Sequence, residues 1–432
     1  MVHPAPGLTG TNVWGDGVDA ALAAFPAANL TGTVADARLP STAQAATLSA
    51  TYARKVIYNV RAYGATGNGT TDDTAAINAA ITAASVGGMY RSAVLYFPNG
   101  VYLVSALIDF GNLVVEGEGF ASGYNGSSAP FGDAGWTTPA TIGSSIIKST
   151  LTTGNAFTRT SYSRISRIAL VGPGTGTSTG LLQETFALAM RTDNLVVANF
   201  STGVSLIDAY FCHDDSLFIQ GCPTGLSLNS ISAANTYINP LIRDCGTAVD
   251  INGAQMSSFI GGCFQYNAGP KIVNLHGTNA RENIFQGVYF ENPTATGSPY
   301  ALYCDTSSDH TTVTGCHFSS TADNIYVASN SNQILYPAQF QGTLTNVGLG
   351  NAFLGRFDPG TIVDTGSQTS LADPYALTQV GRDLKVMGAT GLNGVTPVGK
   401  AGAITSPTSD TVGTKAAIDA IRAALTAIGI TA

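Results

Sequence analysis

The middle of the chain repeats one short pattern at a nearly constant interval. Phe200–Leu206 recurs as Cys222–Leu228 and then as Cys245–Ile251, at steps of 22 and 23 residues, and a Gly-x-x-Phe unit recurs at Gly261, Gly287 and Gly315, at steps of 26 and 28 residues. Each unit pairs an alternating apolar stretch with Gly, Asn, Ser or Thr, which indicates strand, turn and strand rather than helix. Such a period is typical of a solenoid, in which stacked coils supply the core that one coil lacks.

The repeat therefore predicts an all-β fold, a parallel β-helix built as a single-stranded solenoid from about residue 57 to 345. The interval of the repeats places Val204, Leu226 and Val249 at equivalent positions of successive coils. We expect these three side chains to share one inward column. Segment 93–104 reads as strand, turn and strand, and it begins the coil.

The chain divides into four regions by composition. We expect an extended arm at 1–54, the β-helix at 55–350, a small β-rich region at 351–405 outside the repeat, and an oligomerisation helix at 406–432. Apolar spacing also predicts a helix over 73–84, with Asp72 at its N-cap, that covers one end of the solenoid.

The C-terminal segment carries apolar residues at helical spacing: Val412, Ile418, Ile421, Leu425 and Ile428. The last four are separated by 3, 4 and 3 residues, which is a short coiled-coil seam. A helix this small gains most of its stability from packing, so we expect it to pack against copies of itself. Docking onto its own β-helix is the alternative.

Composition and charge exclude several classes of protein. A net charge of -8 without Lys and Arg clusters argues against nucleic acid as a partner. No apolar run reaches the roughly 18 residues of a membrane span, so no membrane insertion is expected. The start of the chain, 1–7, lacks the basic and apolar stretches of a secretory signal. Cys222 and Cys245 occupy the same repeat position, so inward stacked thiols are expected rather than disulfides.

Three segments near the start of the coil carry a resemblance to a known family. Val60–Ile77, Leu95–Tyr102 and Val114–Gly119 closely resemble the opening of the pectate-lyase-like superfamily, in the branch found in phage tailspikes and glycan-active enzymes. The resemblance implies a right-handed parallel β-helix. Asn68 stands where the family usually has Asp. Asp72 and Asp73 belong to this structural opening and are therefore expected to cap and turn the chain rather than catalyse.

Both ends of the chain resemble phage virion proteins. The segments are Gly10–Gly15 and Leu30–Pro40 near the start, and Gly391–Lys400 and Ala424–Ile430 near the end. This resemblance implies a homotrimeric virion component, assembled in the host cytoplasm. Its N-terminal arm would attach to other tail or capsid proteins, and its ligand would be a host surface polysaccharide.

The catalytic motifs of polygalacturonases are largely missing. Asp214-Asp215 is present, but Gly-His-Gly and Arg-Ile-Lys are not. Aligning Leu195 with Leu217 places Asp193 over Asp215, one coil apart, where neighbouring strands lie about 4.8 Å from each other. Two such carboxylates can act as the acid and the base or nucleophile of a glycosidase, with Asp214 orienting the substrate.

A turn ladder is the alternative explanation of this pair, because Asn194, Ser216 and Asn239 read as adjoining rungs. Glu291 is the next catalytic candidate, in a polar column with Gln265 and Ser319. Arg243 could meet an anionic sugar.

A long Gly- and Ser-rich loop, 119–145, carries Tyr124 and Trp136 as possible sugar-stacking residues, or else packs as a flap on the coil. The five histidines are dispersed, and no metal site or cofactor is expected.

These residues leave three classes of function open. The first is a phage tailspike or tail fibre that binds host glycan, with or without depolymerising it. The second is a purely architectural virion fibre. The third is a cellular carbohydrate-active enzyme, either a polysaccharide lyase or a glycoside hydrolase.

Overall fold

The structure is a computed structural model that describes residues 56–85, 93–119, 144–183, 186–229, 231–291, 300–320, 323–355, 357, 361–367, 369–372 and 423. The predicted arm at 1–54 and the seam residues of the predicted C-terminal helix lie outside these residues. Val56 begins the unit that holds the repeats.

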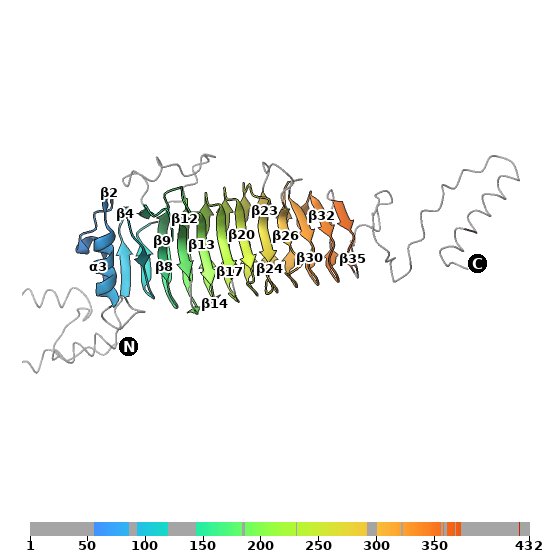
Figure 1. Ribbon diagram of the computed structural model, residues 1–432, viewed down its shortest axis with the longest axis horizontal. Helices are drawn as coiled ribbons and strands as arrows, with labels where there is room; N and C mark the ends of the chain where they lie inside the picture. The colour runs from blue at the N-terminus through green and yellow to red at the C-terminus, as the bar shows by residue number, and fades with distance from the viewer. Residues whose placement is uncertain are drawn as a thin grey trace, which may run out of the picture. The chain divides into compact units, whose positions relative to one another are not determined.

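Strands of successive coils pair in parallel and form three faces of a solenoid (Figure 1). Face 1 contains β1 (Val56–Asn59), β3 (Ala93–Phe97), β6 (Val114–Gly117), β9 (Arg164–Val171), β12 (Arg191–Ala198), β15 (His213–Asp215), β18 (Thr236–Ile238), β21 (Ser258–Ile260), β24 (Ile284–Gln286), β27 (Thr312–Thr314), β30 (Gln333–Leu335), β33 (Ala352–Leu354) and β35 (Ser370–Ala372). Face 2 contains β2 (Asn68–Asp72), β4 (Gly100–Val104), β7 (Ser145–Ser149), the second halves of β9 and β12, β16 (Phe218–Gln220), β19 (Leu241–Arg243), β22 (Cys263–Gln265), β25 (Tyr289–Glu291), β28 (His317–Phe318) and β31 (Gln339–Phe340). Because β9 and β12 run through both faces, faces 1 and 2 form one 22-stranded sheet.

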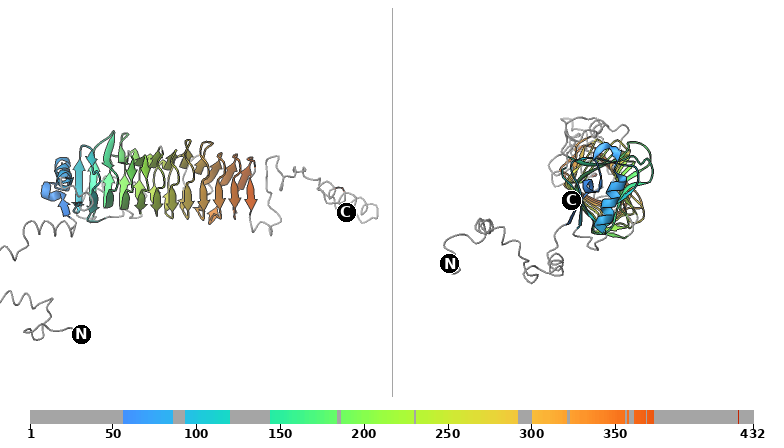
Figure 2. Two further views of the ribbon diagram at one scale, coloured as in Figure 1. Left: turned by 90° about the horizontal axis from the view of Figure 1, so that it is seen from below. Right: turned by 90° about the vertical axis from the view of Figure 1, so that its left-hand side faces the viewer.

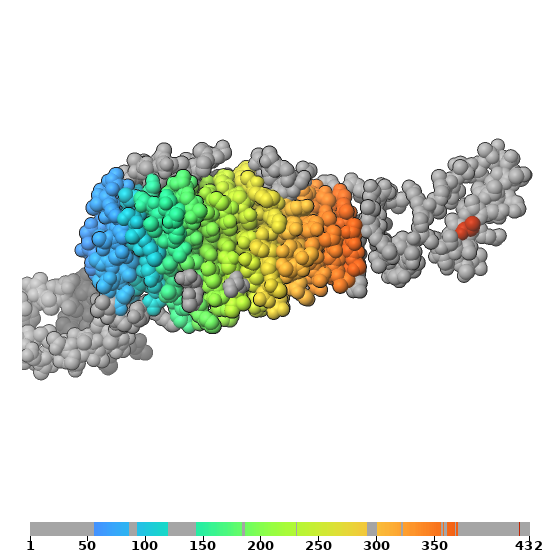
Figure 3. All heavy atoms as spheres, viewed as in Figure 1, coloured from blue at the N-terminus to red at the C-terminus, as the bar shows by residue number. Residues whose placement is uncertain are grey.

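Face 3 is a separate 11-stranded sheet. It contains β5 (Ile108–Asp109), β8 (Asn155–Arg159), β10 (Thr179–Gln183), β13 (Thr202–Ile207), β17 (Thr224–Asn229), β20 (Thr247–Asn252), β23 (Lys271–His276), β26 (Tyr300–Cys304), β29 (Asn324–Val327), β32 (Thr343–Asn346) and β34 (Thr361–Asp364). A short parallel pair, β11 (Ala187–Leu188) and β14 (Ala209–Tyr210), lies between faces 3 and 1 along the chain. The space-filling view shows the coils packed against one another along the stack (Figure 3).

The predicted parallel β-helix is confirmed, and so is its core register. Val204 pairs with Leu226, and Leu226 pairs with Val249, so the three occupy one column of face 3. All three are buried. Cys222 and Cys245 are buried free thiols, as the repeat predicted, and none of the six cysteines forms a disulfide.

One helix covers the N-terminal end of the stack. The helix α3 (Thr74–Ser85) buries Ile77, Ala80 and Ala84 and follows the 3-10 turn η2 (Val60–Tyr63). The end-on view shows α3 lying across the first coils (Figure 2). Asp72 accepts a hydrogen bond from the backbone N–H of Thr74 at 3.0 Å, while the buried carboxylate of Asp73 accepts from Thr66 and Gly67. Both aspartates therefore act as capping and turn residues.

Faces 1 and 2 are joined by a short bend, which between β15 and β16 consists of the two residues Ser216 and Leu217. The first residue of this bend in each coil, which we call its rung, has positive φ, the left-handed conformation that Asn and Gly adopt most readily. The rungs are Arg167, Asn194, Ser216, Asn239, Gly261, Gly287, Gly315, Tyr336 and Gly355. The predicted ladder of Asn194, Ser216 and Asn239 is thus three consecutive bend rungs.

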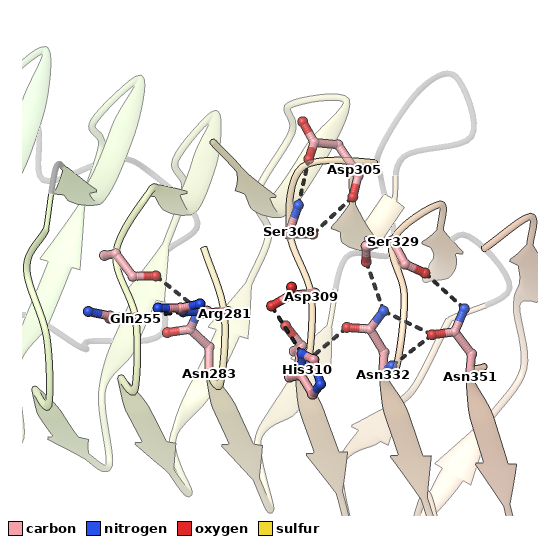
Figure 4. Close-up of polar contacts among 12 residues, drawn as sticks. Gln255, Arg281, Asn283, Asp305, Ser308, Asp309, His310, Ser329, Asn332 and Asn351 are labelled. Atoms are coloured by element: carbon pink, nitrogen blue, oxygen red, sulfur yellow. Dashed lines mark hydrogen bonds and ion pairs between the residues drawn. The ribbon is translucent and has the colours of Figure 1, made fainter. Parts of the chain in front are cut away.

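A second ladder lines the inside of the corner where face 1 begins. It consists of the buried polar residues Asn235, Ser257, Asn283, Thr311, Asn332 and Asn351, each directly before a strand of face 1. Asn332 Oδ1 accepts from the backbone N–H of Thr311 at 2.9 Å, and Asn351 Oδ1 accepts from that of Asn332 at 2.7 Å (Figure 4). These amides satisfy backbone groups that the turn leaves without partners.

The parallel pairing continues past residue 350, the expected end of the repeat. Ala352–Leu354 pairs with β30, Thr361–Asp364 pairs with β32, and Ser370–Ala372 pairs with β33. The first part of the predicted β-rich region, 351–405, therefore extends the solenoid as far as Ala372.

Candidate functional site

Asp193 and Asp215 lie opposite each other on adjacent strands of face 1, in the register that the sequence predicts. Both side chains are partly exposed, and both point away from the core. Asp193 Oδ2 forms a salt bridge with Arg164 Nη2 at 3.3 Å, and its Oδ1 accepts from Asn194 at 2.7 Å. Asp215 Oδ1 accepts from the hydroxyl of Ser216 at 3.0 Å. The pair is therefore an open arrangement of two carboxylates beside one guanidinium.

The bend explains the neighbours of these aspartates. Asn194 and Ser216 directly follow them and have φ of 51° and 55°. Backbone conformation alone favours Asn at such positions, since its short polar side chain tolerates the left-handed region. The turn ladder is thus present, and the two exposed carboxylates lie directly beside it.

Asp214 faces the interior, and this corrects the expectation that it orients substrate. It is 1% exposed, because alternate residues of β15 point to opposite sides of the strand. Its Oδ1 accepts from the hydroxyl of Thr192 and lies 3.6 Å from Arg159 Nη2. Tyr237 is its partner on the next strand. A carboxylate enclosed in this way cannot reach a glycan on the outer face.

Burial shifts the ionisation of this internal group. Desolvation raises the pKa of Asp214, although the charge of Arg159 acts in the opposite direction. The same desolvation lowers the pKa of Arg159 and raises that of Tyr237. Arg159 also donates to the backbone carbonyl of Arg191 at 2.8 Å. The group is therefore a buried polar network inside the core.

Arg243 and Glu291 occur in one outer column of face 2, with Gln265 between them. Gln265 Nε2 donates to Glu291 Oε2 at 2.8 Å. Arg243 Nε donates to Asp244 Oδ2 at 2.9 Å, its guanidinium lies over the ring of Tyr266, and its side chain is only 7% exposed. Arg243 is therefore enclosed by its own neighbours. Glu291 belongs to a different face from Asp193 and Asp215, so the structure does not bring the catalytic candidates together.

Tyr124 and Trp136 lie outside the described residues. The structure also contains an outer aromatic group that the sequence analysis missed, formed by Tyr300, Tyr303 and Tyr326 on face 3. Tyr303 and Tyr326 are separated by 23 residues, one coil, and this interval was the available signal.

Among the described residues, no cluster of three or more His, Cys, Asp or Glu side chains is arranged to hold a metal ion. The part of the chain that the structure describes contains no helix with the length and hydropathy of a membrane span.

The sequence of the first coils matches one known family. Residues 57–257 match the family described as rhamnogalacturonase A/epimerase, pectate lyase-like. These residues form a pectate-lyase-like domain. The match spans α3 and the coils that carry Asp193 and Asp215, so this candidate pair lies within the domain.

Similar solved structures include phage proteins. ORF18 of Geobacillus virus E2 is 17% identical, with a TM-score of 0.45, and the match covers 77% of this chain and 62% of that one. The enzymatically active domain of bacteriophage CBA120 tailspike protein 2 is 15% identical, with a TM-score of 0.43, over 78% of this chain and 45% of that one. The chain therefore spans less than two thirds of both proteins.

One curated protein shares a short segment. The non-secreted LysM effector LysM19 of Penicillium expansum is 52% identical over 60 residues, which are 12% of this chain and 5% of that protein.

Proposed function

We propose that the protein is the tailspike or tail fibre of a phage virion and that it binds a host surface polysaccharide along its β-helix. We propose further that it depolymerises the bound polysaccharide at Asp193 and Asp215. The register carries the proposal, because it places two outward carboxylates on adjacent strands of one face. The matched family supports it, since that family is named for a rhamnogalacturonase and an epimerase.

The neighbours of the two carboxylates suggest their roles. The Cα atoms of paired strands lie about 4.8 Å apart, close to the roughly 5–5.5 Å that separates the carboxyl groups of a retaining glycosidase. Asp193 forms a salt bridge with Arg164, and we assign it the role of nucleophile or base. Asp215, whose carboxylate accepts from the Ser216 hydroxyl, is then the proton donor to the glycosidic oxygen. These roles use only side chains of this chain.

The test follows chain length of purified host envelope polysaccharide during incubation with the full-length protein. Asp193→Asn and Asp215→Asn keep the shape of the side chain and remove its charge. We expect each to lower the rate by at least about 10²-fold while the protein folds normally. The matched control is Asp208→Asn, at a positive-φ position between faces 3 and 1, where Asn is equally suited to the backbone. Unchanged rates in both variants would move the chemistry elsewhere, with Glu291 next.

One observation favours a binding fibre without catalysis. The salt bridge to Arg164 and the bend ladder account for Asp193, Asn194 and Ser216 as structural residues. A receptor-binding fibre predicts that the wild-type protein binds its host glycan without shortening it. The same chain-length experiment, with bound glycan measured in parallel, separates the two functions.

The assembly is part of the same proposal. The phage-like segments at both ends favour a homotrimer joined through 1–54 and about 351–432, with the arm attached to other virion proteins. A cellular carbohydrate-active enzyme would instead occur in host cells that carry no phage. Detection of the protein in purified virions, by mass spectrometry, tests the virion assignment.

A further inference from the structure

The side chains on the outer side of face 3 change from small polar to aromatic along the stack. One outward column runs Ser205, Ser227, Asp250, Asn274, Tyr303, Tyr326 and Thr345 on successive coils. The residues that alternate with it, such as Val273, Leu302 and Ile325, are buried in the core. Small polar side chains thus give way to two adjacent tyrosines on the solvent side of the sheet.

Three tyrosines form one aromatic group at this place. The rings of Tyr303 and Tyr326 stack with centroids 4.9 Å apart and planes 12° from parallel. Tyr300 lies in the neighbouring outward column, and its ring is 5.4 Å from both, inclined by 57° and 54°. All three side chains are partly exposed. The stack ends at Tyr326, because Thr345 follows it in the column, and no other described aromatic ring contacts Tyr326.

A cation lies at the other end of the stack. Lys271 pairs in register with Tyr300, and its Nζ lies 3.6 Å from the centroid of the Tyr303 ring. Within the described residues no carboxylate lies within salt-bridge distance of this ammonium group. The ring face holds the cation in place while its charge stays available to an anion.

Polar side chains lie beside Lys271 on its own coil and on the coil before it. Asp250 Oδ1 accepts from Asn274 Nδ2 at 2.8 Å and lies 3.0 Å from His276 Nε2. These contacts fix the orientation of the carboxylate and of the imidazole. The outer side of face 3 therefore presents hydrogen-bonding groups, a cation and aromatic rings in sequence along the solenoid axis.

We propose that this surface, defined by Asp250, Lys271, Asn274, Tyr300, Tyr303 and Tyr326, is a binding platform for an acidic polysaccharide that lies along the solenoid axis. The C–H face of a pyranose ring packs on the free face of Tyr326 or on Tyr300, and a carboxylate of another sugar residue meets Lys271. Asp250 accepts hydrogen bonds from sugar hydroxyl groups, and the amide of Asn274 donates to them. The inference rests on the proposed glycan-binding function and adds a binding surface on a face that carries neither Asp193 nor Asp215.

Chemistry favours a sugar polymer over a protein at this place. The tyrosines are isolated among polar neighbours rather than part of a broad apolar patch, as a ligand site with few apolar contacts and several oriented polar groups requires. A repeating ligand also suits a surface whose rungs repeat at about 4.8 Å.

The experiment screens the full-length protein on an array of bacterial surface polysaccharides and polygalacturonate, and then uses the tightest-binding acidic polymer and its carboxyl-reduced form. We expect Tyr326→Ala and Tyr300→Ala to weaken binding of both polymers by about tenfold. Tyr326→Phe keeps the ring and should stay within about twofold of the wild type. Lys271→Gln should weaken binding of the acidic polymer only. Tyr63→Ala, which removes an exposed tyrosine of the 3-10 turn η2, is the matched control.

The outcomes separate this inference from the proposed function. If the wild-type protein binds no polysaccharide on the array, both are overturned. If it binds one and Tyr300→Ala and Tyr326→Ala bind as tightly as Tyr63→Ala, the platform is overturned and glycan binding elsewhere stands. Equal effects of Lys271→Gln on the acidic and carboxyl-reduced polymers would overturn the acidic specificity. Circular dichroism of each variant shows whether it folds.

Discussion

Arg159 and Asp214 form an ion pair inside the solenoid, where neither charge reaches water. Removing two charges from water costs several kcal/mol per ion, and their attraction does not always offset that cost. Asp214 Oδ2 and the hydroxyl of Tyr237, on the adjacent strand, have no hydrogen-bond partner among the described residues. The network is therefore only partly satisfied.

The first prediction concerns the two halves of this pair. Asp214→Ala leaves the guanidinium of Arg159 buried without its counter-ion, so the free energy of unfolding should fall by about 3–5 kcal/mol. The double variant Arg159→Met/Asp214→Leu removes both charges and keeps most of the volume. It should recover most of that loss, as measured by urea unfolding followed by circular dichroism. A double variant less stable than Asp214→Ala would show that the pair stabilises the core.

The second prediction concerns pH. Desolvation raises the pKa of Asp214 above its ordinary value of 3.8, so the folded protein holds this proton more tightly than the unfolded chain does. Its stabilising contribution is complete below about pH 3.8 and is lost as the pH rises through the raised pKa. Asp214→Asn cannot titrate. Its unfolding free energy, measured across that range, should therefore decline less with rising pH than that of the wild type, and parallel curves would contradict this.

At the scale of residues, the sequence predicted which residues pair on adjacent strands better than it predicted the surroundings of each side chain. The interval of 22 residues was enough to place Asp193 opposite Asp215, since one coil length sets the pairing. Strand alternation places Asp214 on the opposite side of β15 from Asp215. Its buried partner Arg159 comes from face 3, so no local pattern indicated which group would lie beside Asp214 inside the core.

At the scale of elements, the buried polar ladder before face 1 links each coil to the next by hydrogen bonds. The side chain of Asn332 is buried and accepts from the backbone N–H of Thr311, and Ser329 accepts from its amide group (Figure 4). A buried N–H without a partner costs about 1–3 kcal/mol.

The third prediction is that Asn332→Leu lowers the free energy of unfolding by about 1–3 kcal/mol, because Thr311 loses its acceptor. The matched control is Asn330→Leu. Asn330 also accepts from a backbone N–H, that of Leu349, but its side chain is exposed, so water can replace it. Urea unfolding of both variants makes the comparison. An equal loss of stability in the two variants would contradict the role given to burial.

Element boundaries were predictable only where the repeat was strong. Strands 93–97 and 100–104 lie on the two sides of the predicted turn, and the helix begins one residue after the predicted start, at Thr74. The strands after residue 350 do not continue the unit in its place: Gly350 and Phe353 have the Gly-x-x-Phe spacing, but Phe353 lies on face 1. The Phe residues of the repeated unit, Phe264, Phe290 and Phe318, lie on face 2. The places of these last strands come from pairing with earlier coils, which the local sequence does not indicate.

At the scale of the whole molecule, one corner exposes a row of large apolar side chains. Tyr162, Phe211 and Met256 occupy positive-φ positions on alternate coils, and the smaller Ala189 and Ala234 stand between them. Bulky residues rarely adopt this conformation, and exposed apolar patches commonly mark interaction sites.

Phe186 lies at the other end of β11 from Ala189, with its ring 5.8 Å from that of Tyr210, and it is 70% exposed; Phe211 is 66% exposed. Large and small side chains in alternation suit interdigitation with a second surface of the same kind, as in packed cores. The row is thus a surface by which the side-by-side β-helices of the proposed homotrimer could contact one another.

The last prediction tests that contact in the full-length protein. The wild type should have the mass of a trimer at micromolar concentration by light scattering. The double variant Phe186→Ser/Phe211→Ser should dissociate at higher protein concentration than the wild type, because each buried Phe contributes about 1.5–3 kcal/mol when it leaves water. Ile284→Ser, at an exposed position of face 1, is the control and should leave the mass unchanged. A wild-type monomer would contradict the homotrimer itself, whereas a trimer equally stable in the double variant would place the contacts at the two ends of the chain and away from this corner.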